Sequence, residues 1–590
     1  MTGNISDIYE ANGPKPKDSR LLVGLRAVRS TTIHLSKVAF KFMKYIGPGL
    51  MVSVAYMDPG NFSSSIASAR FQYKLLFSLL VSNVMAGIMQ IQACKLGICT
   101  GQDLATNCRK HLPKYLNYII YVFAEISVIA TDVAEIIGTA IAFNILFNIP
   151  LFLGVLLTTI DVLVVIMAYR PNGPPLVLRL FEGFVSLLVL LTVACFVIEL
   201  SKVSHDTNWG SVARGFLPSK DIFSNTEGLY LSAALLGSNL MPHSLYLGSG
   251  VVQSRMKDYD VKHGLYTMPK QNSRQNAIFC YPSKREKVSK EEEVIENTSG
   301  LSESTVSADS TDYTPSIGAV ETTMNYTIGE LIVSLIVVAL FVNAAILIIA
   351  GTALSKPRDD DGDGDLENAD LFTLHYLLSS HLSQTAGTIF ALALLFSGLC
   401  GGTVVTMAGQ MIMEGHAKLS MPPGLKRILT RIVSITPCII VVIKSGREGL
   451  SSVLNGSQVI LSMLLPFVSA PLIYLTCNKK IMRVRVGKSY GTSSEDSSEM
   501  ELQNMSGQQD TDQEQNRHAN SGRYDELPTG NNDNHEVYKD MSNGKVSGII
   551  SLLFGFSSVF SIFGFSQAWP WARMFHYNCI AFYIWHIYLV

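Results

Sequence analysis

Two short motifs place polar side chains beside a proline in the middle of an apolar stretch. The first is Asp58-Pro59-Gly60-Asn61, within the apolar run 40–66. Proline and glycine interrupt helical hydrogen bonding, so an unwound turn is expected here that frees backbone carbonyls inside a bilayer. The Asp58 carboxylate and the Asn61 amide oxygen could then point at one small ligand. A carboxylate at mid-membrane costs about 3 kcal/mol and usually marks a ligand or a pathway; the alternative is a proline kink whose aspartate bonds a neighbouring helix.

The second motif is GSNLMPHS at 237–244, again with a proline in mid-segment. The Met241 thioether is soft, and combined with oxygen ligands it favours Mn²⁺, Fe²⁺ or Co²⁺ over Ca²⁺ and Mg²⁺. The chain has 21 methionines, and such a residue more often only packs; its place beside Pro242 favours the ligand role. His243 could be a ligand, a proton carrier or a hydrogen-bonded interior residue. We favour a proton or gating role for His243, because Met241 already occupies the turn that faces inward.

A third group of polar residues forms an acidic stripe. Glu125, Asp132 and Glu135 are spaced by seven and three residues, which places them within roughly 80° of one another on a helix. Such a stripe in a membrane helix suggests a proton relay, or a structural network closed by Arg431; the two interpretations are compatible. Gln458 lies in another apolar segment, where its amide could supply a further oxygen ligand or cross-link two helices.

The composition indicates the kind of protein that positions these residues. The chain has 590 residues, of which 48% are hydrophobic and 16% charged, against about 25% charged in soluble domains. A net charge of −1 gives no case for nucleic-acid binding, and the absence of a nucleotide-binding loop or hydrolase motif argues against an enzyme. The pattern predicts an all-α polytopic membrane protein. The expected spans are 40–67, 75–97, 115–147, 151–169, 176–200, 226–252, 327–354, 385–413, 427–444, 450–476 and 546–566.

Polar segments separate these spans. Residues 1–38 are expected to form a cytosolic tail, and 255–323 and 486–540 disordered cytosolic loops. Basic residues gather in the loops that face the cytosol if the N-terminus is inside, which puts the acidic run Asp359–Asp365 outside or in a lumen. A short amphipathic helix is expected at 371–381. The segment 546–590 would hold the eleventh span and an apolar tail. The two interrupted spans each begin a set of five, and matching breaks of this kind point to a transporter site.

These residues resemble the NRAMP family of divalent-metal transporters, over about residues 40–477 and part of the eleventh span. The low-complexity loops suggest a fungal-type member. The motifs that carry the resemblance are Asp58-Pro59-Gly60-Asn61, Met241-Pro242-His243, Thr100-Gly101-Gln102-Asp103-Leu104-Ala105, and Ala408-Gly409-Gln410 followed by Met413-Glu414-Gly415.

The resemblance implies a LeuT-like fold with 39–200 and 226–477 as inverted repeats of five spans, plus the eleventh. It implies symport of Mn²⁺ or Fe²⁺, and of Co²⁺, Zn²⁺ or Cd²⁺, with protons toward the cytosol. No cofactor is implied. The expected membrane is plasma, vacuolar or endosomal, and adaptors for trafficking or ubiquitin ligation are expected on the cytosolic loops. The implied metal ligands are Asp58, Asn61, Met241, the carbonyls of Ala55 and Ser238, and Gln458 when the site is occluded; the implied proton pathway is His243, Glu125, Asp132, Glu135 and Arg431.

The chain departs from the family pattern at three positions. Ser238 stands where alanine is common and Ser244 where asparagine is common, and neither change removes a backbone carbonyl. Gly248 stands where many members have a second histidine, which puts in doubt any scheme that needs two histidines. Two rival functions stay open: a metal-sensing, receptor-like protein without turnover, and an amino-acid or sodium-coupled transporter on the same fold. The Asp58 and Met241 pair argues against the latter.

Overall fold

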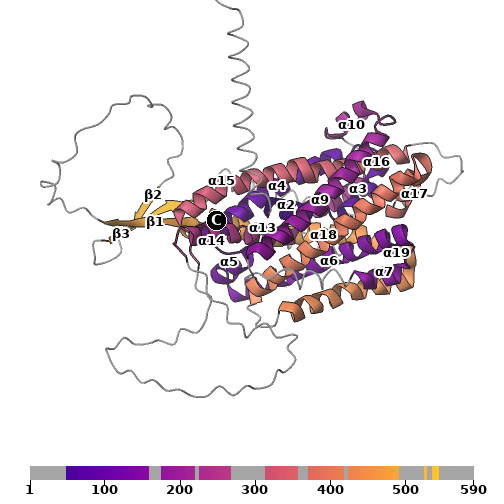
Figure 1. The fold of residues 1–590 in the computed structure, drawn as a ribbon. Helices are drawn as coiled ribbons and strands as arrows, with labels where there is room; N and C mark the ends of the chain where they lie inside the picture. The colour runs from indigo at the N-terminus through magenta and orange to yellow at the C-terminus, as the bar shows by residue number, and fades with distance from the viewer. Residues whose placement is uncertain are drawn as a thin grey trace, which may run out of the picture. The chain divides into compact units, whose positions relative to one another are not determined.

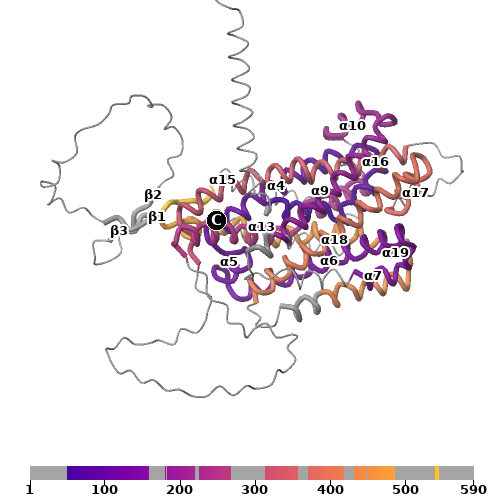
Figure 2. Tube along the Cα trace, in the orientation of Figure 1, coloured from indigo at the N-terminus to yellow at the C-terminus, as the bar shows by residue number. Residues whose placement is uncertain are grey.

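The computed structural model describes residues 48–158, 175–219, 225–266, 313–355, 370–417, 423–490, 524–527 and 534–543. These residues form a helical bundle with a small sheet (Figures 1 and 2). In chain order its helices are α2 (Pro48–Val54), α3 (Pro59–Ser68), the 3₁₀ turn η1 (Ala69–Phe71), α4 (Leu76–Thr100), α5 (Leu104–His111), α6 (Lys114–Phe147), α7 (Leu151–Leu157), α9 (Pro175–Val203), α10 (Trp209–Gly215), α12 (Thr226–Asn239), α13 (Pro242–Val251), α14 (Gln253–Lys262), α15 (Ile317–Val333), the π-helical turn η3 (Ser334–Ala339), α16 (Leu340–Leu354), α17 (Leu371–His381), α18 (Gln384–Ala417), α19 (Pro423–Cys477) and α20 (Lys479–Met482).

Six helical segments among the described residues are long and apolar enough to cross a membrane. They are Leu76–Thr100, Lys114–Phe147, Glu182–Val203, Ile317–Leu354, Gln384–Ala417 and Gly449–Cys477. The helix α6 packs against both α18 and α19, and α12 packs against α19, α3 and α4. The short helix α3 contacts α12, α16, α19 and α6, and the short helix α13 contacts α4, α18, α19 and α6, so long helices pack around both.

Both interrupted spans are broken at the expected prolines. The first is split into α2 and α3, and the second into α12 and α13. The residue before each proline is extended, with φ −76° and ψ 164° at Asp58 and φ −69° and ψ 124° at Met241. Steric conflict between a proline ring and the preceding residue disfavours the helical conformation there. The local sequence therefore determines both where each helix ends and where the next begins.

The expected spans 427–444 and 450–476 both lie in α19, which consists of two helices joined by a kink. The kink lies at Gly446, where φ is 55° and ψ is −135°, a conformation that glycine adopts without steric cost. The element packs against α6, α12 and α3, and Arg447 is the first residue after the kink.

Two loop assignments need correction. Residues 253–262 form α14 and residues from 317 onward form α15, so the expected disordered loop 255–323 is too long at both ends. Within and beside 486–540 lie the strands β1 (Arg483–Tyr490), β2 (Tyr524–Leu527) and β3 (Asn534–Asp540), which form an antiparallel sheet in the order β1-β3-β2. Backbone pairing between distant segments has no local sequence signal, which is why composition alone missed the sheet.

Four expectations lie outside the described residues. They are the tail 1–38, the acidic run Asp359–Asp365, the end of the fourth span, 159–169, and the eleventh span and tail, 546–590. The helix at 371–381 is present as α17, with the expected bounds.

Candidate metal site between two broken helices

Asp58 and Asn61 present oxygen atoms at the first break. Asp58 caps α3, and its Oδ1 accepts a hydrogen bond from the Asn61 backbone N–H at 2.8 Å. The Asn61 side-chain Nδ2 donates to the Tyr56 carbonyl at 2.6 Å. Both side chains are buried, and within the described structure Asp58 Oδ2 and Asn61 Oδ1 have no hydrogen-bond partner. Buried polar atoms are nearly always paired, so these two oxygens are arranged for a ligand that can fill the gap.

Gln458 of α19 lies against the same break. A Cβ atom on Gly60 would lie 1.9 Å from Gln458 Nε2 and 3.2 Å from Asp58 Oδ2, so the amide and the carboxylate flank one glycine. The Gln458 side chain is fully buried and its Oε1 also lacks a partner among the residues described. On the other side, a Cβ on Gly237 would lie 1.9 Å from the Gln458 carbonyl oxygen. Gln458 therefore lies between the two broken helices.

Met241 enters from the second break. Its side chain is fully buried and packs with Ala130 of α6 and Leu461 of α19. Leu461 follows Gln458 by three residues on one face of α19, about 4.5 Å along the helix axis. The Asp58 carboxylate and the Met241 side chain thus lie against adjacent turns of the same helix face.

The two breaks correspond residue by residue. Pro59 is four residues after Ala55, and Pro242 is four residues after Ser238. Because proline has no N–H, the carbonyls of Ala55 and Ser238 lose the helical donor they would otherwise have. In the same register Asp58 and Met241 each precede the proline. Sequence reasoning recognised the matching breaks but missed this correspondence, which appears when the two halves are aligned on their prolines.

Amide and hydroxyl groups from other helices form hydrogen bonds at the two breaks and stabilise their conformation. Asn343 Nδ2 of α16 donates to the Tyr56 carbonyl at 2.7 Å and to Asn239 Oδ1 at 2.8 Å, so one side chain contacts both interrupted spans. The Ser397 hydroxyl of α18 donates to the Met57 carbonyl. The sequence analysis selected neither Asn343 nor Ser397. The signal that could have found Asn343 is its polar amide within the apolar span 327–354.

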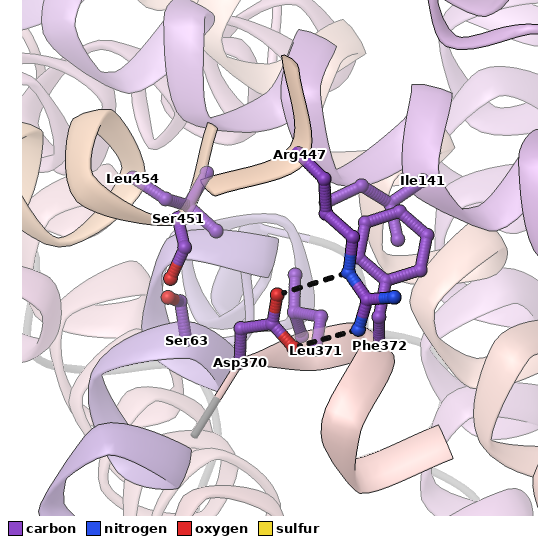
Figure 3. A pocket seen from close by; sticks show the side chains of 8 residues that line it. All are labelled: Ser63, Ile141, Asp370, Leu371, Phe372, Arg447, Ser451 and Leu454. Carbon is purple, nitrogen blue, oxygen red and sulfur yellow. Dashed lines mark hydrogen bonds and ion pairs between the residues drawn. The ribbon is translucent and has the colours of Figure 1, made fainter. Parts of the chain in front are cut away.

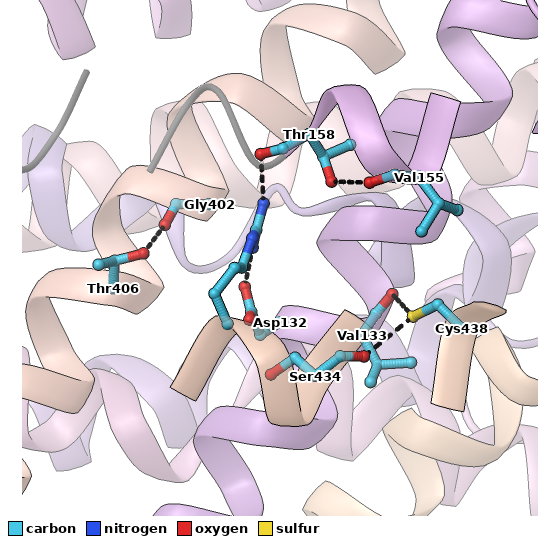
Figure 4. Close-up of polar contacts among 9 residues, drawn as sticks. Asp132, Val133, Val155, Thr158, Gly402, Thr406, Ser434 and Cys438 are labelled. Atoms are coloured by element: carbon cyan, nitrogen blue, oxygen red, sulfur yellow. Dashed lines mark hydrogen bonds and ion pairs between the residues drawn. The ribbon is translucent and has the colours of Figure 1, made fainter. Parts of the chain in front are cut away.

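The acidic stripe lies on α6, beside α13, α18 and α19. Asp132 forms a buried ion pair with Arg431, whose Nη2 donates to the Thr158 carbonyl at 2.9 Å (Figure 4). Glu135 is buried against Gly401 of α18, whereas Glu125 is only partly buried.

His243 joins this region from α13. Its Nδ1 lies 3.2 Å from the Thr131 hydroxyl, next in sequence to Asp132, and its Nε2 has no hydrogen-bond partner within the described ranges. The structure thus brings Asp132, Arg431 and His243 to one part of α6.

The departures at 244 and 248 have a common structural explanation. A Cβ on Gly248 would lie 2.2 Å from Gln90 Oε1, so Gln90 of α4 fills the space beside Gly248. Gln90 Nε2 donates to the Tyr56 and Ser244 hydroxyl oxygens, both at 2.8 Å. A polar cluster of Tyr56, Gln90 and Ser244 therefore lies where a second histidine side chain would need room.

The helix α2 is held at its start by Glu330 of α15. Glu330 Oε1 accepts from the Gly49 N–H at 2.9 Å, and Arg255 Nη1 lies 3.5 Å from Glu330 Oε2. The Ser334 hydroxyl donates to the Gly49 carbonyl at 3.1 Å. These contacts hold the start of α2 against α15 and η3.

The ligand atoms of the candidate site suit an ion that binds and is then released. Among the described residues, no group of three or more His, Cys, Asp or Glu is arranged to hold a metal. The candidate site instead offers one carboxylate, two amides, a thioether and backbone carbonyls. Such ligands bind divalent transition metals more weakly than clusters of thiolates or imidazoles.

Comparisons with known proteins agree on the family. The family described as natural resistance-associated macrophage protein-like matches residues 49–490. The chain is similar to the iron transporter SMF3 of Saccharomyces cerevisiae, with 47% identity over 75% of this chain and 84% of that protein. It is also similar to the manganese transporter SMF2 of the same yeast, with 46% identity over 89% of this chain and 88% of that protein.

A solved structure agrees with the fold. The manganese transporter of Eremococcus coleocola superposes with a TM-score of 0.61 at 26% identity, over 92% of this chain and 94% of that one. The LeuT-like arrangement expected from the sequence is confirmed by this match, and so is a multi-pass membrane protein.

Proposed function

Because the chain belongs to the natural resistance-associated macrophage protein (NRAMP) family, we propose that it carries Mn²⁺ or Fe²⁺ across a membrane together with protons, toward the cytosol. The observation that supports this most is the group of three buried, unpartnered oxygens on Asp58, Asn61 and Gln458. The Met241 side chain packs on Leu461, one helical turn along α19 from Gln458. The proposed ligands are Asp58, Asn61, Met241, Gln458 and the carbonyls of Ala55 and Ser238.

The proposed ligand chemistry selects the ion. The carboxylate supplies the negative charge that offsets the loss of water from a dication inside the bilayer. Amide and carbonyl oxygens complete the shell without adding charge, so the ion can leave again. The thioether lowers the affinity for Ca²⁺ and Mg²⁺, which prefer oxygen alone. Co²⁺, Zn²⁺ and Cd²⁺ fit the same donors.

The proposed proton route uses α6. The Asp132 carboxylate can take up a proton when its ion pair with Arg431 opens, and the His243 imidazole can carry one close to the same helix. Glu135 and Glu125 extend the route along α6. In this proposal, charge that arrives with the metal at Asp58 is compensated by proton movement through these groups.

The test is uptake by proteoliposomes with an imposed pH gradient. Purified protein is expected to accumulate Mn²⁺ and Fe²⁺, and faster when the side from which metal enters is acidic. The Asp58→Ala variant is the control for leak. Metal binding in solution without any flux would contradict transport and favour a sensor, and flux that ignores the pH gradient would contradict proton coupling.

A further inference from the structure

One face of α19 leads from the candidate metal site to an exposed arginine. Arg447, Ser451, Leu454 and Gln458 are spaced by four, three and four residues, which places them on one helix face. The Arg447 side chain is 52% exposed, whereas Gln458 is fully buried. This face therefore connects the surface to the candidate site.

The helix α3 supplies the opposite wall of this path. Ser63 follows Gly60 by three residues, and its hydroxyl donates to Asn455 Oδ1 at 2.8 Å. A small pocket lies between the two helices, and the Ser63 and Ser451 hydroxyls face each other across it (Figure 3). The pocket is lined by Ser63, Ile141, Asp370, Leu371, Phe372, Arg447, Ser451 and Leu454.

Two of the residues that line this pocket form an ion pair. Arg447 Nη2 lies 3.3 Å from Asp370 Oδ1, and Nε lies 3.4 Å from Oδ2, so the guanidinium meets the carboxylate with two nitrogens (Figure 3). The guanidinium also lies over the Phe372 ring, 4.2 Å from its centroid. Two-point contact and stacking hold the arginine in one orientation.

Both partners are fixed by their elements. Asp370 caps α17, accepting from the Thr373 N–H and hydroxyl, each at 2.7 Å. Arg447 follows the bend at Gly446, so its direction depends on how the two parts of α19 meet. Separation of α17 from α19 would break the ion pair of Asp370 with Arg447. Motion of either helix would therefore change the pocket that this pair lines.

We propose that Asp370 and Arg447 form a latch that closes the entry path to the metal site in this conformation. The proposal rests on the proposed transport function. A guanidinium that lines the pocket repels an incoming dication, and when Arg447 moves away the released Asp370 carboxylate attracts one. Asp370 and Arg447 thus act as positioning residues for entry, distinct from the ligands.

Thiol labelling of Ser63→Cys tests the latch directly. A charged methanethiosulfonate reagent is applied to the purified protein in detergent, and labelling of the parent protein is subtracted to remove the contribution of native cysteines. Breaking the latch with Arg447→Gln or Asp370→Asn is expected to speed labelling about two- to fivefold, the range that a partly exposed ion pair supports. The double variant Asp370→Asn/Arg447→Gln is expected to label no faster than either single variant, because each single change already breaks the pair.

The control is Lys262→Gln, which breaks the exposed pair of Lys262 with Asp258 and is expected to leave labelling unchanged. Monodispersity on size exclusion identifies variants that fail to fold. Equal labelling rates with an intact and a broken latch, in folded protein, would overturn the proposal. Labelling requires no metal flux, so this outcome is separate from failure of the transport proposal.

Discussion

At the scale of single residues, Asp58 performs two tasks with its two carboxylate oxygens. One oxygen caps α3 and the other is unpartnered toward Gln458. Replacement of Asp58 by Ala or Asn is expected to reduce Mn²⁺ uptake to the level of empty liposomes, because no other carboxylate lies in the proposed ligand set. Uptake of ⁵⁴Mn by proteoliposomes measures this, with Asp258→Asn on the exposed face of α14 as control. Substantial uptake by Asp58→Ala would contradict the site.

Met241 is expected to control selectivity more than rate. Met241→Ala should retain Mn²⁺ uptake but admit Ca²⁺ and Mg²⁺, because removing the soft ligand leaves a site of oxygens alone. Competition of Ca²⁺ with Mn²⁺ in the uptake assay measures the change, and Met256→Ala, buried elsewhere in the core, is the matched control. If Ca²⁺ competes no better in Met241→Ala than in the parent, the thioether does not select the ion.

At the scale of elements, Arg431 joins three helices through two contacts. It pairs with Asp132 of α6 and donates to the carbonyl of Thr158, the residue after α7. Arg431→Met is expected to destabilise the protein by about 3–5 kcal/mol, because it leaves a buried carboxylate without its partner. Thermal unfolding in detergent measures the loss. The double variant Arg431→Met/Asp132→Asn should recover most of it, and no recovery would mean that the ion pair is not the cause.

Contact between α12 and α19 depends on Gly237. Its Cα faces the Gln458 carbonyl so closely that any side chain would displace α12 from α19. Gly237→Val is expected to weaken metal binding at least about tenfold, since Gln458 and the Ser238 carbonyl would move apart. Gly456→Val, on α19 with open space around it, is the control. Titration with Co²⁺ measures both; unchanged affinity in Gly237→Val would show that this contact does not shape the site.

The elements also show what the sequence could predict. Both helix breaks, the bounds of α17 and most spans followed from local rules: proline position, apolar length and amphipathic spacing. Asn343 and Ser397 were missed because each acts on a backbone carbonyl far away in sequence, which no local pattern encodes. The strands β1 and β3 were missed for the same reason, because the residues that pair lie far apart in the sequence. The segment between them also has few hydrophobic residues, which predicted a disordered loop.

At the scale of the whole molecule, the proposed proton route and the proposed metal site are separate regions, and α6 and α13 contact both. We expect the double variant Asp132→Asn/Arg431→Gln, which removes both charges together, to retain Mn²⁺ uptake down a metal gradient and to lose stimulation by an imposed pH gradient. Proteoliposome flux with an internal pH dye measures both quantities. Stimulation equal to that of the parent would exclude Asp132 and Arg431 from the proton route.

The central claim is that an oxygen from one broken helix and a sulfur from the other hold the same ion. X-ray absorption at the metal edge of Co²⁺-loaded protein tests it most directly. The expected first shell is mostly oxygen with one sulfur, the sulfur disappearing in Met241→Ala while the ion stays bound. A shell of oxygen and nitrogen alone in the parent protein, unchanged by Met241→Ala, would contradict the account.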